Sequence, residues 1–71
     1  MSIQEFIDKF FSGSVSIDCV YVYSHDNRGN KVPVVANGDA KFDHVEVSWL
    51  NGSPYADLEF TVLWDDVVRL T

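Results

Sequence analysis

The sequence predicts an α+β fold, with a short N-terminal helix packed on one face of a four- to five-stranded antiparallel meander sheet. Residues 1–11 place apolar side chains at helical spacing, whereas the rest of the chain alternates stretches rich in Val, Tyr, Phe and Trp with Gly, Asn and Pro turns. The connections between these stretches are short, and short loops favour antiparallel neighbours. We therefore expect one compact domain over residues 1–71, built around a single core.

The helix is predicted to begin at a capping box, in which the side chains of Ser2 and Glu5 each bond to the backbone of the other residue. Apolar residues then recur at the spacing of one helix face: Ile3, Phe6, Ile7, Phe10 and Phe11. Gly13 suits the left-handed conformation that ends many helices. A helix of about ten residues is not stable alone in water, so its apolar side must dock on the sheet.

Five stretches of the remaining chain have strand character: residues 15–24, 31–35, 41–50, 55–64 and 67–70, the last being a short strand or an extension of the fourth. Pro33 lacks an amide donor, so we expect the second stretch to be short or to lie at a sheet edge. The fourth stretch has the clearest alternation, and its apolar face carries Ala56, Leu58, Phe60, Val62 and Trp64. We therefore expect Phe60 and Trp64 to be core residues beneath the helix.

The charge of the chain narrows the classes of function. Eleven Asp and Glu stand against five Lys and Arg, which gives a formal net charge of -6 and a pI of about 4.4. Binding to nucleic acid or to an anionic membrane needs clustered cations, so we expect neither as a direct partner. A partner protein with a basic surface is compatible with this charge.

The composition predicts a folded, cytoplasmic protein. Hydrophobic residues make up 46% of the chain, which is too many for a disordered one. No apolar run approaches the ~20 residues of a membrane span, and Glu5 and Asp8 interrupt the N-terminal segment, unlike a secretory signal. The single cysteine, Cys19, excludes an intrachain disulfide and fits a reducing compartment. We expect a complete intracellular chain, located in the host cytoplasm if a phage encodes it.

Strand periodicity places several acids on one outward face. If the Asn-Gly-Ser-Pro turn forms a four-residue hairpin loop, Glu46 lies opposite Glu59. Ser48 then lies opposite Asp57. A loop two residues longer places Glu46 beside Thr61 instead. In either register, no Lys or Arg of this hairpin face separates Glu46, Asp57 and Glu59.

These three acids are the candidate partner-binding residues, and we expect Asp18 and Asp65 to extend the set. Acids that alternate along a strand are ~7 Å apart, which is close to the roughly 6–7 Å between neighbouring phosphates of nucleic acid. The face either keeps the protein soluble or mimics nucleic acid for a basic partner. We favour a small acidic, non-enzymatic inhibitor or regulator, comparable in size and charge to inhibitors that phages and mobile elements encode, such as anti-CRISPR proteins.

A second apolar surface is the basis of an alternative function. One helix cannot cover both faces of a sheet, yet four apolar residues fall on the side away from the predicted core: Val20, Val22, Phe42 and Leu63. They form either a minor cluster beneath the C-terminal segment or a dimer or docking patch. The alternative is therefore a structural or assembly module that acts as a homodimer through this apolar face.

No set of residues indicates catalysis, a metal site or a cofactor. Zinc sites usually need three or four Cys or His ligands, and the chain has only Cys19, His25 and His44. Cys19 shares a strand face with Tyr21, so we expect a buried structural thiol rather than a nucleophile. His44 is expected to face outward near Glu46.

Overall fold

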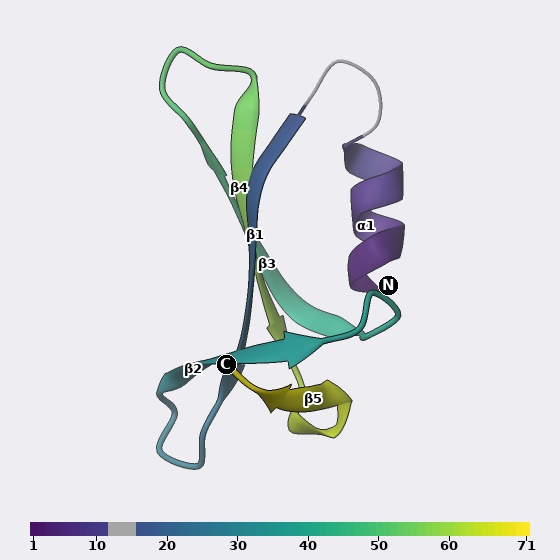
Figure 1. The fold of residues 1–71 in the computed structure, drawn as a ribbon, viewed down its shortest axis with the longest axis vertical. Coiled ribbons are helices and arrows are strands. Elements are labelled where there is room, and N and C mark those ends of the chain that lie inside the picture. The colour runs from purple at the N-terminus through teal and green to yellow at the C-terminus, as the bar shows by residue number, and fades with distance from the viewer. Residues whose placement is uncertain (12–15) are drawn as a thin grey trace.

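A computed structural model describes residues 1–11 and 16–71 of the chain. Its elements, in chain order, are α1 (Ile3–Phe10), β1 (Ser16–His25), β2 (Lys31–Ala36), β3 (Phe42–Trp49), β4 (Tyr55–Val62), the 3-10 helix η1 (Trp64–Asp66) and β5 (Val67–Leu70) (Figure 1). Within these residues, one α-helix and one five-stranded sheet confirm the predicted α+β class. No helix in this part of the chain is both long enough and apolar enough to cross a membrane.

The sheet is mixed, so the predicted antiparallel meander is wrong. Its strand order is β3-β4-β1-β2-β5, and β1 pairs parallel to β4, while the other three pairings are antiparallel. The turn after β2 carries the chain past the start of α1 to the far edge of the sheet. There the amide of Ile3 donates to the carbonyl of Ala40 at 3.0 Å, and the amide of Gln4 donates to the carbonyl of Gly38 at 2.9 Å. β2 is short, as Pro33 predicted, but it lies between β1 and β5 rather than at an edge.

Helix α1 begins at the capping box that the sequence predicted. The hydroxyl oxygen of Ser2 accepts a hydrogen bond from the amide of Glu5 at 3.2 Å, and the carboxylate of Glu5 accepts one from the amide of Ser2 at 3.0 Å. The bond from the Ser2 amide, followed by one from the Ser2 side chain, lowers the pKa of Glu5 below its usual value. The expected helix stop at Gly13 lies outside the described residues.

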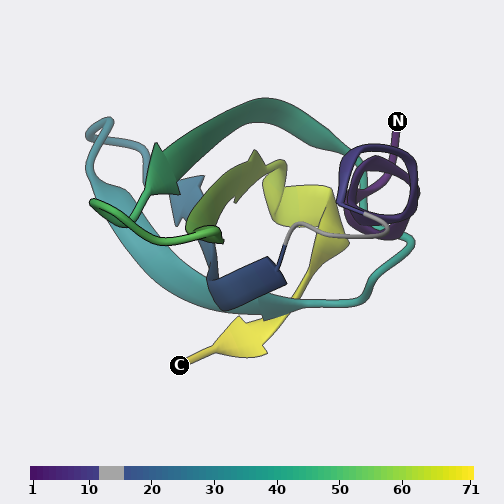
Figure 2. The same ribbon diagram turned by 90° about the horizontal axis from the view of Figure 1, so that it is seen from above.

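The core lies between α1 and one face of the sheet. Figure 2 shows that the sheet curls, with α1 placed beside the start of β3. Phe60 of β4 is fully buried, and its ring packs against those of Phe6 in α1 and Phe42 in β3, with centroid distances of 5.7 and 5.0 Å. Leu58 and Val62, the alternate neighbours of Phe60 in β4, belong to the same buried cluster. The prediction that Phe60 is a core residue is confirmed.

Trp64, by contrast, is not a core residue. β4 ends at Val62, and Trp64 is 45% exposed at the start of η1. Its indole N–H donates to the carbonyl of His25 at the end of β1. Together with His25 and Asp26, it lines an open hollow of about 330 Å³. The prediction is wrong because the chain leaves the strand before Trp64, so the alternation of β4 no longer applies to it.

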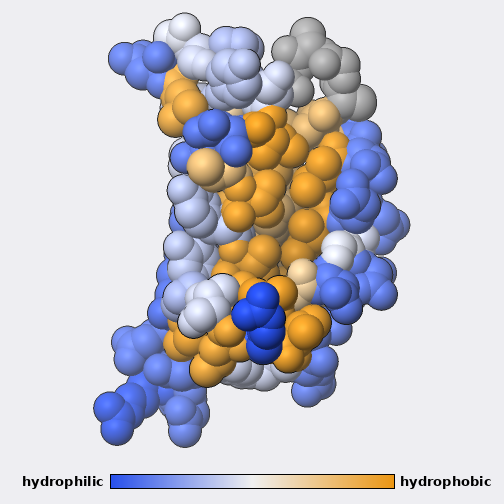
Figure 3. Space-filling model, viewed as in Figure 1, coloured by the Kyte–Doolittle hydropathy of each residue, from blue (hydrophilic) through white to orange (hydrophobic). Residues whose placement is uncertain are grey.

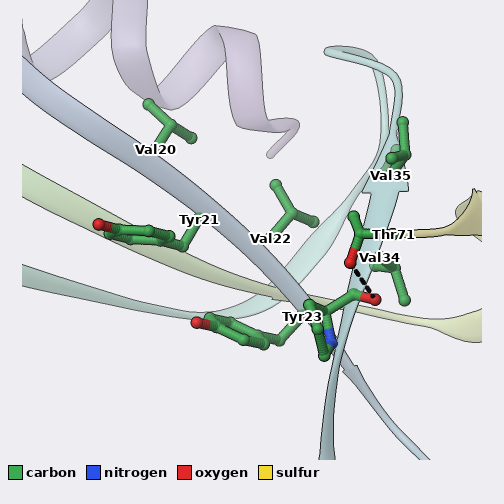
Figure 4. Close-up of a pocket in the computed structure, with 9 residues that line it drawn as sticks. Val20, Tyr21, Val22, Tyr23, Val34, Val35 and Thr71 are labelled. Carbon is green, nitrogen blue, oxygen red and sulfur yellow. Dashed lines mark hydrogen bonds between the residues drawn. The ribbon is translucent and has the colours of Figure 1, made fainter.

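A β-bulge in β1 decides which of its side chains face the helix. The pairing with β4 shifts between Ile17 and Cys19, which leaves Asp18 as an extra residue. One extra residue reverses the alternation beyond it. Val20 and Val22 therefore point toward α1, and the neighbouring tyrosines point away (Figure 4). The expectation that these two valines lie on the face away from the helix is wrong, because it assumes an unbroken strand.

A second bulge has the same effect in β3. Its pairing with β4 shifts between Phe42 and His44, and Asp43 is the extra residue. Phe42 thereby faces the core, where its ring lies 5.5 Å from a phenylalanine ring of α1. The four residues predicted to form an apolar second face do not lie together. Val22 and Phe42 pack against the core, whereas Val20 and Leu63 are exposed.

Candidate functional site

The predicted acidic residues gather on the outer face of the sheet, which we define as the face opposite α1. Leu58 and Phe60 of β4 are fully buried on the helix side, so Asp57 and Glu59 face outward. The strand register adds residues of β3 and β1 to the same face, which then carries Glu46, Ser48, Asp57, Glu59, Cys19 and Tyr21. Three of the five acids predicted to bind a partner therefore lie together.

The β3–β4 hairpin has the register of a four-residue loop. Glu46 lies opposite Glu59, and Ser48 lies opposite Asp57. The register with the longer loop is not found. Two carboxylates directly opposite each other destabilise a strand pair. His44 faces outward as expected, and its Nε2 lies 3.5 Å from a carboxylate oxygen of Glu46, which reduces the repulsion when the imidazole is protonated.

Lys31 is a cation on the outer face that the sequence analysis did not place there. Its ammonium group forms an ion pair with Glu59 and lies 5.2 Å from the centre of the Tyr23 ring. Lys31 belongs to β2 and reaches across β1 to β4, so the parallel β1–β4 pairing is what brings it to Glu59. Exposed ion pairs contribute only about 0–1 kcal/mol. Among the described residues, Glu46 and Asp57 form no ion pair with Lys or Arg.

Asp57 combines a structural role with its surface charge. One of its carboxylate oxygens accepts a hydrogen bond from the backbone amide of Cys19 at 3.2 Å. Cys19 directly follows the bulge in β1, where the backbone ladder between strands is interrupted. At this point the carboxylate accepts a hydrogen bond that a backbone carbonyl would accept in a regular strand pair. A substitution at Asp57 therefore changes the bulge as well as the charge of the outer face.

Asp18, Cys19 and Asp57 form a compact group at the bulge. One ligating atom from each side chain lies within 4.8 Å of the others, and the Cys19 sulfur lies 3.8 Å from a carboxylate oxygen of Asp18. A hydrogen bond with Cys19, then the charges of Cys19 and Asp57, raise the pKa of the Tyr21 hydroxyl above its usual value. Two carboxylates and a thiol offer ligands to a cation, but Asp57 already serves the bulge, and exposed acidic groups are common without a metal.

Cys19 is half-buried on the outer face, so the prediction of a buried thiol is wrong. The bulge turns Cys19 outward together with Tyr21. Nucleophilic catalysis by a thiol needs a base within hydrogen-bond reach. In the part of the chain that the structure describes, the thiol of Cys19 contacts Asp18 and Tyr21, Asp57 bonds only to the Cys19 amide, and no histidine hydrogen-bonds to the thiol.

The two acids predicted to extend the site have different positions. Asp18 stands at the bulge beside Asp57, at the margin of the outer face. Asp65 lies in η1, after β4 has ended at Val62, so it is exposed but is not part of the strand face. As with Trp64, periodicity assigned Asp65 to a strand that ends before it.

No family model, curated protein or solved structure matches this chain.

Proposed function

We propose that this protein is a non-enzymatic inhibitor or regulator that binds a basic surface of one partner protein through its outer face. The observation that carries the proposal is the group of Glu46, Asp57 and Glu59 on two paired strands. Paired strands fix the backbone positions of these residues, so no backbone ordering is needed when a partner binds. The net charge of -6 adds long-range attraction toward a basic surface and raises the association rate.

A nucleic-acid-binding surface is the basic partner that suits this arrangement best. Asp57 and Glu59 alternate along β4, so they are ~7 Å apart, and neighbouring phosphates of a nucleic-acid strand are separated by roughly 6–7 Å. Lys and Arg side chains arranged for phosphates would meet carboxylates at a similar spacing. We propose that the protein acts in the cytoplasm, as an inhibitor of the kind that phages and mobile elements encode.

The alternative function, a homodimeric assembly module with an apolar outer sheet face, has less support. Val22 and Phe42 pack against the core, so they are not available for such an interface. A symmetric dimer through the outer face would instead place its acidic side chains against their own copies, which costs free energy. Exposed apolar side chains remain on the helix side, where Phe10 and Trp49 are 53% and 57% exposed.

Affinity capture with two charge-matched variants tests the proposal. The face variant Glu46→Gln with Glu59→Gln removes two charges from the outer face. The control variant Asp39→Asn with Asp65→Asn removes two exposed charges elsewhere. Asp57 is left unchanged because it supports the bulge. From an extract of the cells in which the protein acts, wild type and control should capture the same nucleic-acid-binding protein, and the face variant should capture about tenfold less.

Surface plasmon resonance with the purified partner completes the test. The protein should compete with nucleic acid for the partner, and its association rate should fall as salt increases, because exposed charges are screened. Equal capture by the three baits would show that the acidic face only keeps the protein soluble. A captured partner whose nucleic-acid binding is not competed would contradict the proposed mimicry.

A further inference from the structure

The central strand β1 has an open edge over most of its length. β4 pairs with β1 along residues 16–23, whereas β2 occupies the other side of β1 only along residues 23–25. Beyond this point β2 turns away and pairs with β5. Among the described residues, no strand pairs with the second edge of β1 along residues 16–22.

The backbone amides of Val20 and Val22 point to this open edge. Alternate residues of a strand direct their amides and carbonyls to the same side. The amide of Asp26 donates to the carbonyl of Asn30 across the β1–β2 turn at 3.0 Å. Val20 and Val22 are each an even number of residues from Asp26, so their amides lie on the β2 side of β1. Pro33 has no amide, so the bonds that hold the Tyr23–Pro33 pair come from the flanking residues, and they occupy the carbonyl of Val22 but not the groups of Val20. An added strand would find hydrogen-bonding groups there.

An apolar groove of about 290 Å³ borders the open edge. It lies where β1 and β2 diverge (Figure 4). Three residues at its β2 and C-terminal side line it together with four valines and two tyrosines: Val20, Val22, Val34, Val35, Tyr21 and Tyr23. The space-filling view shows an apolar band in the region between β1 and α1 (Figure 3). Val20, which points into this region, is 43% exposed. The groove therefore offers apolar contacts to the side chains of a strand laid along β1.

The outermost strands of the sheet, unlike this edge, carry features that prevent strand addition. β3 has a bulge at Asp43 and the charged side chain of Glu46. β5 has only four residues, a register shift and the charged side chain of Arg69. The stretch of β1 from Cys19 to Tyr23 has no charged residue and no proline. Edges without such protection favour pairing with another chain.

We propose that a basic, extended segment of the partner protein adds to the open edge of β1 as a further strand. Its apolar side chains enter the groove, and its alternating Lys or Arg side chains lie on the outer face. Charge selects this occupant, since Asp18 lies in β1 itself and Asp57 lies across β1 on β4, and neither forms an ion pair with Lys or Arg in the described residues. A second copy of the chain would instead bring another net charge of -6. This inference rests on the proposed function and specifies how the partner binds.

Lys31 shows, within the molecule, how such a basic residue is accommodated. It approaches from β2, which lies on the same side of β1 as the open edge. It passes the ring of Tyr23 and pairs with Glu59 on β4. The position two residues farther along that edge, opposite Tyr23, is occupied by Pro33, which carries no charge. Asp57, which precedes Glu59 by two positions on β4, therefore has no Lys or Arg partner within the described residues.

Two synthetic heptapeptides test the proposal against the isotopically labelled full chain. One alternates Lys with Val, and the other alternates Glu with Val. We expect the Lys–Val peptide to bind about tenfold more tightly than the Glu–Val peptide and to protect the amides of Val20 and Val22 from hydrogen exchange. Val20→Lys places a like charge in the groove and should weaken Lys–Val binding about tenfold. The control Val68→Lys, at a 56% exposed position of β5, should leave binding unchanged.

The outcomes distinguish this inference from the proposed function. Amide shifts confined to the outer face of β3 and β4 would overturn strand addition and leave the proposed function intact. Equal binding of the two peptides, no binding at millimolar concentration, or full binding by a folded Val20→Lys variant would also overturn it. Strand addition by a partner would also be overturned if, without peptide, protection of the Val22 amide from hydrogen exchange increased with protein concentration. The occupant of the edge would then be a second copy of the chain. Edge binding together with equal capture by the charge variants would support strand addition and contradict the proposed binding of a partner through the acids of the outer face.

Discussion

Replacement of Phe60 tests whether its ring is the centre of the fold. Phe60 is fully buried and packs against the rings of Phe6 and Phe42. Replacing a core Phe by Ala costs about 3–5 kcal/mol. A chain of 71 residues has a total stability of roughly 4–11 kcal/mol, at about 0.05–0.15 kcal/mol per residue. Phe60→Ala should therefore unfold much of the population, which makes it a poor quantitative probe.

Phe60→Leu keeps the variant measurable. Leu retains much of the buried volume but loses two aromatic pairs, each of which contributes about 0.5–1.5 kcal/mol. The expected loss is therefore about 1–3 kcal/mol. Each kcal/mol lowers the Tm of a domain of this size by about 4–8 °C. Circular dichroism during thermal and urea unfolding measures both the Tm and the free energy of unfolding.

Phe10→Leu is the matched control for this measurement. Its ring lies 4.9 Å from that of Phe6, but it is 53% exposed. Little apolar area is lost from the core, so the expected change is below about 1 kcal/mol. Equal destabilisation by Phe60→Leu and Phe10→Leu would refute the conclusion that the buried ring contacts of Phe60 stabilise the fold more than the exposed ring contact of Phe10.

Three further predictions concern the cap, the bulge and the charge. Ser2→Ala should cost about 0.5–2 kcal/mol and raise the pKa of Glu5 part of the way toward its usual value, as an NMR titration would show, because the bond from the amide of residue 2 remains while the side-chain bond is lost. Because folding lowers the pKa of Glu5, the stability that its carboxylate contributes is present above the unfolded pKa near 4.5 and is lost as pH falls through the folded pKa. An identical Glu5 titration in the variant would contradict the capping box. Asp57→Ala should lower the free energy of unfolding, measured with urea, by about 1–3 kcal/mol, because it leaves the Cys19 amide without an acceptor. Asp57→Asn keeps an acceptor oxygen and should recover most of this loss. Equal losses in the two variants would exclude a role of Asp57 in supporting the bulge. The wild-type chain, with its net charge of -6, should not retard DNA or RNA in a mobility-shift assay at physiological salt, and micromolar binding would contradict the charge argument.

The features that the sequence predicted correctly depend on local rules. The capping box joins Ser2 to Glu5, three residues apart. The burial of Phe60 follows from the two-residue period of β4, which holds as far as Val62. The pairing of Glu46 with Glu59 follows from the length of one hairpin loop, so three acids of the candidate site could be placed together from sequence alone.

The features that the sequence analysis missed depend on inserted residues and long-range pairing. Asp18 and Asp43 are each the extra residue of a bulge, and each reverses the faces of the residues on one side of it. Asp is a poor strand residue, but Asp57 lies within β4 without a bulge, so Asp18 and Asp43 gave only a weak signal. The ion pair of Lys31 with Glu59 had no local signal, because it requires β1 to lie between β2 and β4.

The parallel pairing of β1 with β4 also has a consequence for the order in which the chain folds. It joins residues 38 positions apart, such as Cys19 and Asp57. Closing a loop of that length costs about 1.5 kcal/mol more than closing a hairpin of about six residues. The β1–β2 and β3–β4 hairpins depend on local contacts and can form first, but the barrier to folding lies in joining them. During synthesis α1 leaves the ribosome well before Phe60 does, so the helix has no core to pack against until most of the chain has been made.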